Sequence, residues 1–81
     1  MTDVIHSPNV SRFEVGAAFL AYERTGDRFD IQHTVVPPDM EGQGVGGKLV
    51  QAAVDFAKAE GLELVVTCSF ARKWLERHPV G

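Results

Sequence analysis

The first feature that could do chemistry is a cluster of glycines in the middle of the chain. Four of the eight glycines lie within six residues, at Gly42, Gly44, Gly46 and Gly47. They separate a strand-like segment that ends at Val36 from a helical pattern that begins at Val45. Glycine lets a backbone approach a ligand closely, and the unpaired N–H groups of a helix start bind anions, usually phosphate. The segment predicts an anion site; a flexible connection is less favoured, because glycine destabilises a helix.

Two common phosphate motifs match these residues only in part. Gly42, Gly44 and Gly47 satisfy the dinucleotide pattern G-x-G-x-x-G. One βαβ unit is too small for a dinucleotide fold, however, and Glu63 opens the next strand where an acid should close it. The segment also fits the P-loop pattern G-x-x-x-x-G-K, but Leu49 follows where Ser or Thr should bind Mg²⁺. Dinucleotides and nucleoside triphosphates are therefore disfavoured as ligands.

The composition excludes several other classes of function. The formal net charge is −3 and the pI is about 5.5, which argues against nucleic acid as the main ligand. Only Arg72, Lys73 and Arg77 could form a local basic patch. No apolar run approaches the ~20 residues that span a membrane, and the N-terminus lacks signal-peptide features. One cysteine among scattered histidines gives neither a disulfide nor zinc spacing. We expect a cytoplasmic protein with no metal, nucleic-acid partner or membrane association.

The hydrophobic pattern predicts the elements that must position the glycines. The length suits one domain over residues 1–81, with residues 1–10 as a loosely ordered lead-in. Apolar and alternating runs predict strands over residues 12–15, 17–22, 29–36 and 62–67. Apolar positions at steps of three and four predict helices over residues 45–59 and 70–75. Gly61 is expected to end the first helix, and Ser69 and Pro79 to cap and stop the second.

This order of elements, β-β-β-α-β-α, defines the expected fold class. The first three strands are close in sequence and joined by short turns, which is typical of an antiparallel meander. The strand, helix and strand that follow form a right-handed βαβ unit with parallel strands. We therefore predict an α/β (α+β) protein with a mixed sheet, in which the glycine segment lies between the last meander strand and the crossover helix.

Three separated stretches, residues 36–38 with 44–46, residues 32–37 and residues 67–79, together resemble the small, roughly half-length group of GNAT-like acetyltransferases. The apolar strand end, proline turn and glycine loop of the GNAT pattern are matched by Val36-Pro37-Pro38 and Gly44-Val45-Gly46. The strand end of the small group is similar to Gln32-His33-Thr34-Val35-Val36-Pro37. Its Thr-Cys strand end and short helix are matched by Thr67-Cys68-Ser69-Phe70, through Trp74, to His78-Pro79. The resemblance covers roughly residues 13–79, which is nearly the whole chain.

The resemblance implies a GNAT-like fold that binds acetyl-CoA between two splayed parallel strands, here 29–36 and 62–67. It implies that backbone N–H groups of the loop hold the pyrophosphate: Gln43, Gly44, Val45, Gly46 and Gly47. Backbone groups of Val35 and Val36 would pair with the pantetheine arm. Phe70 and Trp74 would line the cleft, either as core residues or in contact with coenzyme A. The resemblance implies that an unknown amine or protein acceptor attacks the thioester directly and that a base removes its proton. A homodimer is compatible with this function.

The resemblance also implies two candidate catalytic residues, Cys68 and His33. Cys68 would lie beside the cleft, where it either positions the thioester, takes the acetyl group covalently or is only a small buried hydrophobe. His33 is expected on one strand face with Phe29, Ile31 and Val35, where a hydrogen-bonded core histidine is favoured over a general base.

Three positions depart from the GNAT pattern. Glu41 stands where a Gln or Arg usually opens the loop, and a carboxylate is unfavourable beside a pyrophosphate. Val35 replaces an expected acidic residue, and Leu75 aligns with the tyrosine that serves larger relatives as general acid. The primary hypothesis is an acetyl-CoA-dependent N-acetyltransferase, and the alternative is a non-catalytic module that binds acyl-CoA or another anion.

Overall fold

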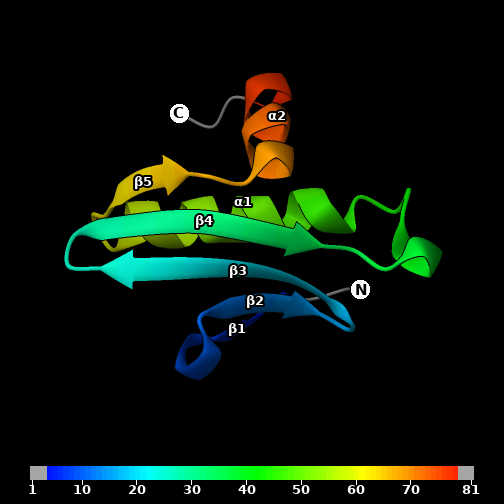
Figure 1. Cartoon of the computed structure of the whole chain (residues 1–81), viewed down its shortest axis with the longest axis horizontal. Helices are drawn as coiled ribbons and strands as arrows, with labels where there is room; N and C mark the ends of the chain where they lie inside the picture. The colour runs from blue at the N-terminus through cyan, green and yellow to red at the C-terminus, as the bar shows by residue number, and fades with distance from the viewer. Residues whose placement is uncertain (1–3, 79–81) are drawn as a thin grey trace.

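The computed structural model describes residues 4–78 as one mixed sheet with two helices (Figure 1). The strands are β1 (Ile5–Ser7), β2 (Arg12–Val15), β3 (Ala18–Thr25), β4 (Arg28–Val35) and β5 (Glu63–Val66). The helices are α1 (Val45–Ala59) and α2 (Ser69–Arg77), and single 3₁₀ turns occupy Pro8–Val10 and Pro38–Met40. The sheet order is β1-β2-β3-β4-β5, with β4 and β5 parallel and every other neighbouring pair antiparallel. The predicted mixed α/β fold is confirmed.

The core lies between one face of the sheet and α1, which crosses behind β4 in Figure 1. The apolar stripe of α1 is almost fully buried and includes Leu49, Val50, Ala53 and Val54. It packs on inward-facing side chains of the sheet, including Phe13, Leu20, Tyr22, Phe29 and Ile31. Small residues on the helix permit close packing on the sheet, which fixes the N-terminus of α1 beside the end of β4. Neither helix within residues 4–78 covers the opposite face of the sheet (Figure 1).

The segment before β2 is more ordered than the sequence predicts. Within the expected lead-in, β1 pairs antiparallel with β2 and adds a fifth strand at the sheet edge. His6 anchors it, because its ring stacks on Phe13 at 4.3 Å and its Nε2 is hydrogen-bonded to the Tyr22 hydroxyl at 2.7 Å. The lead-in prediction was therefore wrong for residues 5–10, since one polar three-residue strand carries too weak a pattern to detect. Pro79, the predicted helix stop, lies outside the described residues.

A β-bulge in β4 reverses which side chains face α1. Tyr22 pairs with Ile31 but the preceding Ala21 pairs with His33, so Gln32 is an extra residue in β4. An extra residue shifts the strand alternation by one position. Beyond the bulge, Thr34 shares the α1 side of the sheet with its partner Leu20. His33 lies on the opposite, exposed face, so the expectation that it shares a face with Ile31 was wrong.

The parallel pair splays apart where the bulge begins. Pairing of β4 with β5 ends at Ile31 and Val66, and the N–H groups of Thr67 and Cys68 both donate to the Ile31 carbonyl at 3.0 Å. The chain then turns away into α2, whereas β4 continues to Val35 without β5 beside it. Cys68, and not Ser69 as predicted, occupies the N-cap position of α2 and makes no side-chain cap bond.

Candidate functional site

Two cavities lie on opposite sides of β4 where the strands splay apart. The inner cavity, of about 480 Å³, lies on the α1 side between the glycine loop, the end of β4 and α2. The outer cavity, of about 680 Å³, lies against the face of the sheet that carries His33 and Val35. Both cavities are lined by Thr34 and Phe70, so they meet at these two side chains.

The loop that opens the inner cavity is held in a conformation that favours glycine. Gly42 and Gly44 have φ values of 81° and 74°, in the left-handed region that other residues rarely adopt. The first helical hydrogen bond of α1 runs from the Lys48 N–H to the Gly44 carbonyl. The N–H groups of Val45 and the next two residues precede it and have no acceptor within the helix. A free helix N-terminus with a positive dipole end therefore borders the cavity.

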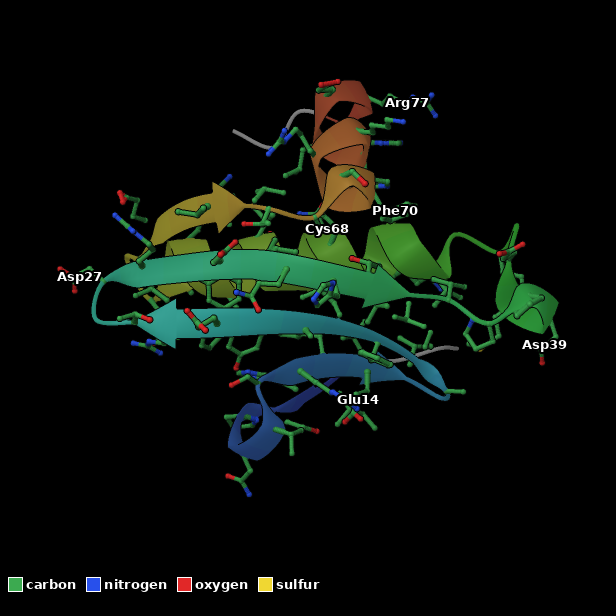
Figure 2. All side chains as sticks on the ribbon, viewed as in Figure 1. Glu14, Asp27, Asp39, Cys68, Phe70 and Arg77 are labelled. Carbon is green, nitrogen blue, oxygen red and sulfur yellow. The ribbon has the colours of Figure 1, made fainter. Side chains whose placement is uncertain are left out.

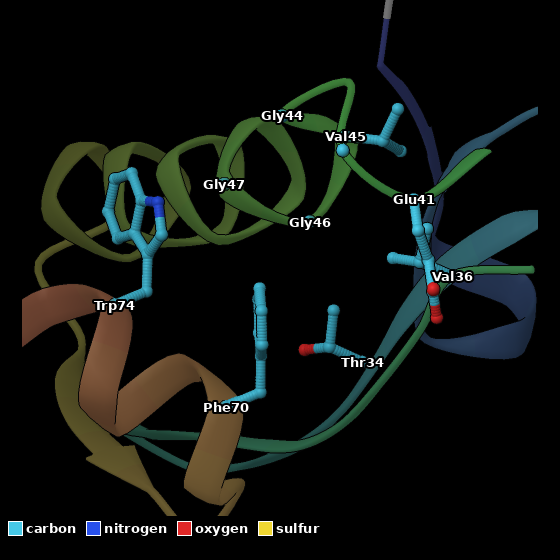
Figure 3. Close-up of a pocket in the computed structure, with 10 residues that line it drawn as sticks. Thr34, Val36, Glu41, Gly44, Val45, Gly46, Gly47, Phe70 and Trp74 are labelled. Carbon is cyan, nitrogen blue, oxygen red and sulfur yellow. The ribbon is translucent and has the colours of Figure 1, made fainter. Parts of the chain in front are cut away.

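The other two glycines make room for α2. A Cβ atom on Gly46 would lie 2.6 Å from Cζ of Phe70, and one on Gly47 would lie 2.5 Å from Nε1 of Trp74. Figure 3 shows the two aromatic side chains reaching from α2 toward the first turn of α1. Phe70 is 45% exposed, so it packs on this turn while leaving one side open to the cavity. The four clustered glycines thus serve two different purposes, backbone conformation and close packing.

One acidic side chain also lines the inner cavity. Glu41 lies beside Val36 at the end of the cavity opposite α2 (Figure 3). It is exposed, and no ion pair within residues 4–78 neutralises it. A carboxylate here partly cancels the positive potential at the N-terminus of α1. The glutamate that replaces the usual Gln or Arg of the GNAT loop pattern therefore weakens the attraction of this site for an anion.

The outer cavity carries the side chains with reactive or proton-accepting atoms. Cys68 lies at the start of α2 beside β4 (Figure 2), with only 9% of its surface exposed. Its Sγ donates a hydrogen bond to Oγ1 of Thr34 at 3.6 Å. Because Thr34 lines both cavities, this contact places the thiol where they meet. His33 lines the same outer cavity from β4, so the structure brings the two candidate catalytic residues to one surface.

The candidate cofactor-binding residues divide among three places. Those that line the inner cavity are Val36, Gly44, Val45, Gly46, Gly47, Phe70 and Trp74. Val35 is 44% exposed and lines the outer cavity, because the bulge turns it away from α1. Gln43 lines neither cavity, and its side-chain Nε2 donates to the Asp39 carbonyl at 3.4 Å. Only its backbone N–H remains a candidate for anion binding.

Two further residues of the site were not identified from the sequence. Thr34 belongs to the Gln-His-Thr stretch, but the alternation of β4 places it on the wrong face unless the bulge is known. Arg12 lies on β2, and its guanidinium carbon is 4.1 Å from the centre of the Phe19 ring, at the far side of the outer cavity. Arg72, assigned to a local basic patch, instead donates to the Val66 carbonyl at 3.0 Å and ties α2 to β5.

Two absences concern the described residues alone. Between residues 4 and 78, no three His, Cys, Asp or Glu side chains gather closely enough to hold a metal ion. Neither helix of this segment has the length and apolar character needed to cross a membrane.

The splayed strands, glycine loop and crossover helix define a class of protein, and comparison with known families identifies it. A family model described as GCN5-related N-acetyl-transferase matches residues 10–80. The chain therefore belongs to the GCN5-related N-acetyltransferase family. The predicted resemblance to a small GNAT-like group is confirmed, and so is the GNAT-like fold.

Individual relatives show how far the similarity extends. Protein NATD1 of Bos taurus is 41% identical over 64 residues, and that of Homo sapiens is 39% identical over 64 residues. Each match covers 78% of this chain but only 57% of the relative, so the similarity spans little more than half of each curated protein. The NMR structure of a GCN5-like N-acetyltransferase candidate from Staphylococcus aureus superposes with a TM-score of 0.74 at 30% identity. That superposition covers 94% of this chain and 79% of the other.

Proposed function

We propose that this protein transfers the acetyl group of acetyl-CoA to the nitrogen of an amine. The observation that carries the proposal is the contact between Cys68 and Thr34, which places a thiol where the inner cavity meets the outer one. One side of the splayed strands then supplies anion-binding backbone, and the other supplies reactive side chains. Both are needed for acetyl transfer from a coenzyme A thioester.

In this proposal the inner cavity binds the coenzyme. The free N–H groups at residues 43–47 hold the pyrophosphate, because a helix N-terminus is a ready anion site. Val36 at the end of β4 and Phe70 on α2 flank the pantetheine arm, while Trp74 closes the cavity on the α2 side. Beyond its pairing with β5, β4 has backbone groups that can pair with the amides of the arm. An N–H of this segment would polarise the thioester carbonyl.

We assign the acyl-transfer chemistry to Cys68 and His33. The Cys68 sulfur attacks the thioester carbonyl carbon, the carbon–sulfur bond to coenzyme A breaks, and coenzyme A leaves as a thiol that carries the proton of Cys68. An amine then attacks the acetyl-cysteine carbonyl and loses a proton to His33. The bond from the acetyl carbon to the Cys68 sulfur breaks, and the departing thiolate takes that proton from His33. A thiol suits this role because it is intrinsically nucleophilic. Val35 stands where the pattern of the small GNAT-like group has an acidic residue, and Leu75 aligns with the tyrosine of larger relatives.

A second function is favoured by one observation. Glu41 lines the inner cavity close to the proposed pyrophosphate, and its charge opposes binding of a polyanion. A non-catalytic module that binds acyl-CoA or another anion weakly would tolerate this charge and would need neither Cys68 nor His33. Release of free coenzyme A that depends on an added amine would reject this second function.

Isothermal titration with acetyl-CoA tests the binding step. Heat of binding is expected for the wild-type protein and should be lost in Gly44→Ala, which strains a residue with φ of 74° at the anion site. Gly26→Ala is the matched control, because Gly26 has φ of 57° and an added Cβ meets nothing within 4 Å at either glycine. No heat and no thermal shift of the wild-type protein at millimolar acetyl-CoA would contradict the proposal.

We further propose a cytoplasmic location, since acetyl-CoA is a cytoplasmic co-substrate of acyl transfer. A homodimer in which a second chain completes the acceptor site also remains our proposal. Size-exclusion chromatography coupled to light scattering would decide between a dimer and a monomer.

A further inference from the structure

The outer cavity has a charged end that the proposed transfer chemistry does not use. Arg12 lines this cavity from β2, and Cys68 and His33 line it from the other side of β3. The register places Arg12, Ala21 and His33 in one row across three strands. The row crosses the sheet face that neither helix covers within residues 4–78 (Figure 1). His33 is exposed on this face, so an incoming acceptor can reach it.

The guanidinium of Arg12 is positioned but has no ionic partner among residues 4–78. Its central carbon lies 4.1 Å from the centre of the Phe19 ring, an arrangement that leaves the in-plane N–H donors available to other partners. The ion pairs within residues 4–78 involve Arg24 and Arg28 but not Arg12. Glu14, the acid two positions along the same strand, accepts a hydrogen bond from the Ser7 hydroxyl.

Among the described residues, those that line the outer cavity include this cation and no carboxylate. A carboxylate lies close by, at Asp30, but its two oxygens accept hydrogen bonds from Thr67 at 2.8 Å and Gln32 at 3.5 Å. These two donors themselves line the cavity, so they lie between Asp30 and its interior. The cavity therefore favours a ligand that carries negative charge.

We infer that the acceptor is a primary amine that also carries an anionic group, a carboxylate in the simplest case, and that Arg12 binds that group. This inference rests on the proposed function, in which the amine must reach Cys68. Arg12 acts as a specificity residue, since it holds the part of the acceptor that does not react. The amine end lies beside His33, which accepts its proton.

The spacing of the sheet limits the length of such an acceptor. From Phe19 to the start of α2 the surface crosses about two strand spacings, or roughly 10 Å. Contacts of about 3 Å to Arg12 and to the acetyl carbon leave roughly 4–7 Å between the anionic group and the amine. A chain of about three to five methylene groups spans this gap, given ~1.5 Å per carbon–carbon bond.

A matched pair of acceptors tests the inference: 6-aminohexanoate and its amide, 6-aminohexanamide, which differ only in charge. With acetyl-CoA present, coenzyme A release is expected to show kcat/KM about tenfold higher for the carboxylate, as a charge-assisted hydrogen bond implies. Arg12→Gln should bring the kcat/KM ratio of carboxylate to amide close to one, and Arg12→Lys should keep part of the preference for the carboxylate. Arg24→Gln is the control, because Arg24 also lies over a phenylalanine ring, that of Phe56, and lines neither cavity.

A binding measurement separates this inference from the proposed function. Nuclear magnetic resonance titration without acetyl-CoA should shift the amide signals of Phe19, His33 and Val35 with the carboxylate and much less with the amide. If acetyl-CoA fails to bind but these shifts occur and vanish in Arg12→Gln, the proposed function fails and the charge preference stands. If acetyl-CoA binds but both acceptors shift the signals and react equally, the inference is overturned and the proposed function stands.

Discussion

The inner and outer cavities meet at Thr34 and Phe70, yet they are built from different parts of the chain. The inner cavity is bordered by backbone, where four glycines either adopt left-handed conformations or admit an aromatic ring from α2. The outer cavity is lined by side chains with distinct chemistry, including Cys68, His33 and Arg12. The charges also differ, because Glu41 lines the inner cavity and Arg12 the outer one.

This difference suggests a division of labour across one strand. In the proposed function, backbone N–H groups of the inner cavity bind the coenzyme, and its side chains contribute little to that binding. Side chains on the opposite face of β4 would then determine the reaction and the acceptor. Substitutions in the inner cavity should therefore change coenzyme binding, whereas substitutions in the outer cavity should change chemistry and leave coenzyme binding intact.

The largest effect is expected from filling the inner cavity at Gly46. Gly46→Leu places a branched side chain where even a Cβ would lie 2.6 Å from Phe70, so the ring must move and the cavity is blocked. We expect acetyl-CoA affinity to fall about 100-fold or more, as overpacking of this size implies. Titration calorimetry measures the loss. Ala59→Leu, at the exposed end of α1, is the control and should bind normally.

Cys68→Ser should separate the functions assigned to the two cavities, because it should slow acetyl transfer and leave coenzyme binding intact. Incubation of the wild-type protein with acetyl-CoA should add the mass of one acetyl group, and the variant should show none. Loss of the nucleophile is expected to slow transfer about 100-fold, while acetyl-CoA affinity stays within about threefold. Intact-mass spectrometry and calorimetry measure these two quantities.

The control for this prediction is Ser69→Ala, which changes the neighbouring side chain of the outer cavity and should keep the adduct. Undiminished transfer to an amine in Cys68→Ser would show that the amine attacks the coenzyme thioester directly, which contradicts the role assigned to Cys68.

Glu41→Gln should strengthen coenzyme binding in the inner cavity. Removal of an exposed carboxylate beside a polyanion contributes about 1 kcal/mol or less, so affinity should rise about threefold. The gain should shrink as salt concentration increases. Asp39→Asn removes an exposed acid of the preceding 3₁₀ turn that lines neither cavity, and should change affinity less. Weaker binding by Glu41→Gln would show that this carboxylate assists the site.

The smallest effect, a pH dependence of stability, is expected from His6, which lines neither cavity. Burial lowers the pKa of His6 below its usual value of about 6.5. The unfolded chain then binds more protons than the folded one near pH 6, so stability falls as pH drops through about 6.5. Urea midpoints at pH 7.5 and 5.5 should differ more for the wild-type protein than for His6→Phe. An equal pH dependence in the two proteins would contradict this assignment.

The sequence predicts the architecture well because the signals are local and strong. Alternating apolar residues predict β4, and apolar residues at steps of three and four predict α1. The glycine segment marks the loop between them, and none of these patterns depends on the rest of the chain. The family pattern could be identified from Val36-Pro37-Pro38 and Thr67-Cys68, which directly follow the ends of β4 and β5.

Sequence patterns miss features that depend on pairing and packing. Nothing in the type of Gln32 marks it as the extra residue of a bulge, so the faces of His33 and Thr34 are assigned wrongly from alternation alone. The four clustered glycines look alike in sequence, yet only Gly42 and Gly44 have positive φ. Arg12 lies at the site because β2 pairs with β3 and β3 pairs with β4, and no local sequence pattern reveals this pairing.

The central claim is that acetyl-CoA occupies the inner cavity with its thioester beside Cys68. Amide chemical-shift mapping with acetyl-CoA, and separately with coenzyme A, tests it most directly. We predict shifts at residues 43–47 and 34–36 with both ligands and a further change at residues 68–70 with acetyl-CoA, while the turn at Gly26 stays unchanged. Shifts confined to the β3–β4 turn, or none at millimolar ligand, would contradict the account.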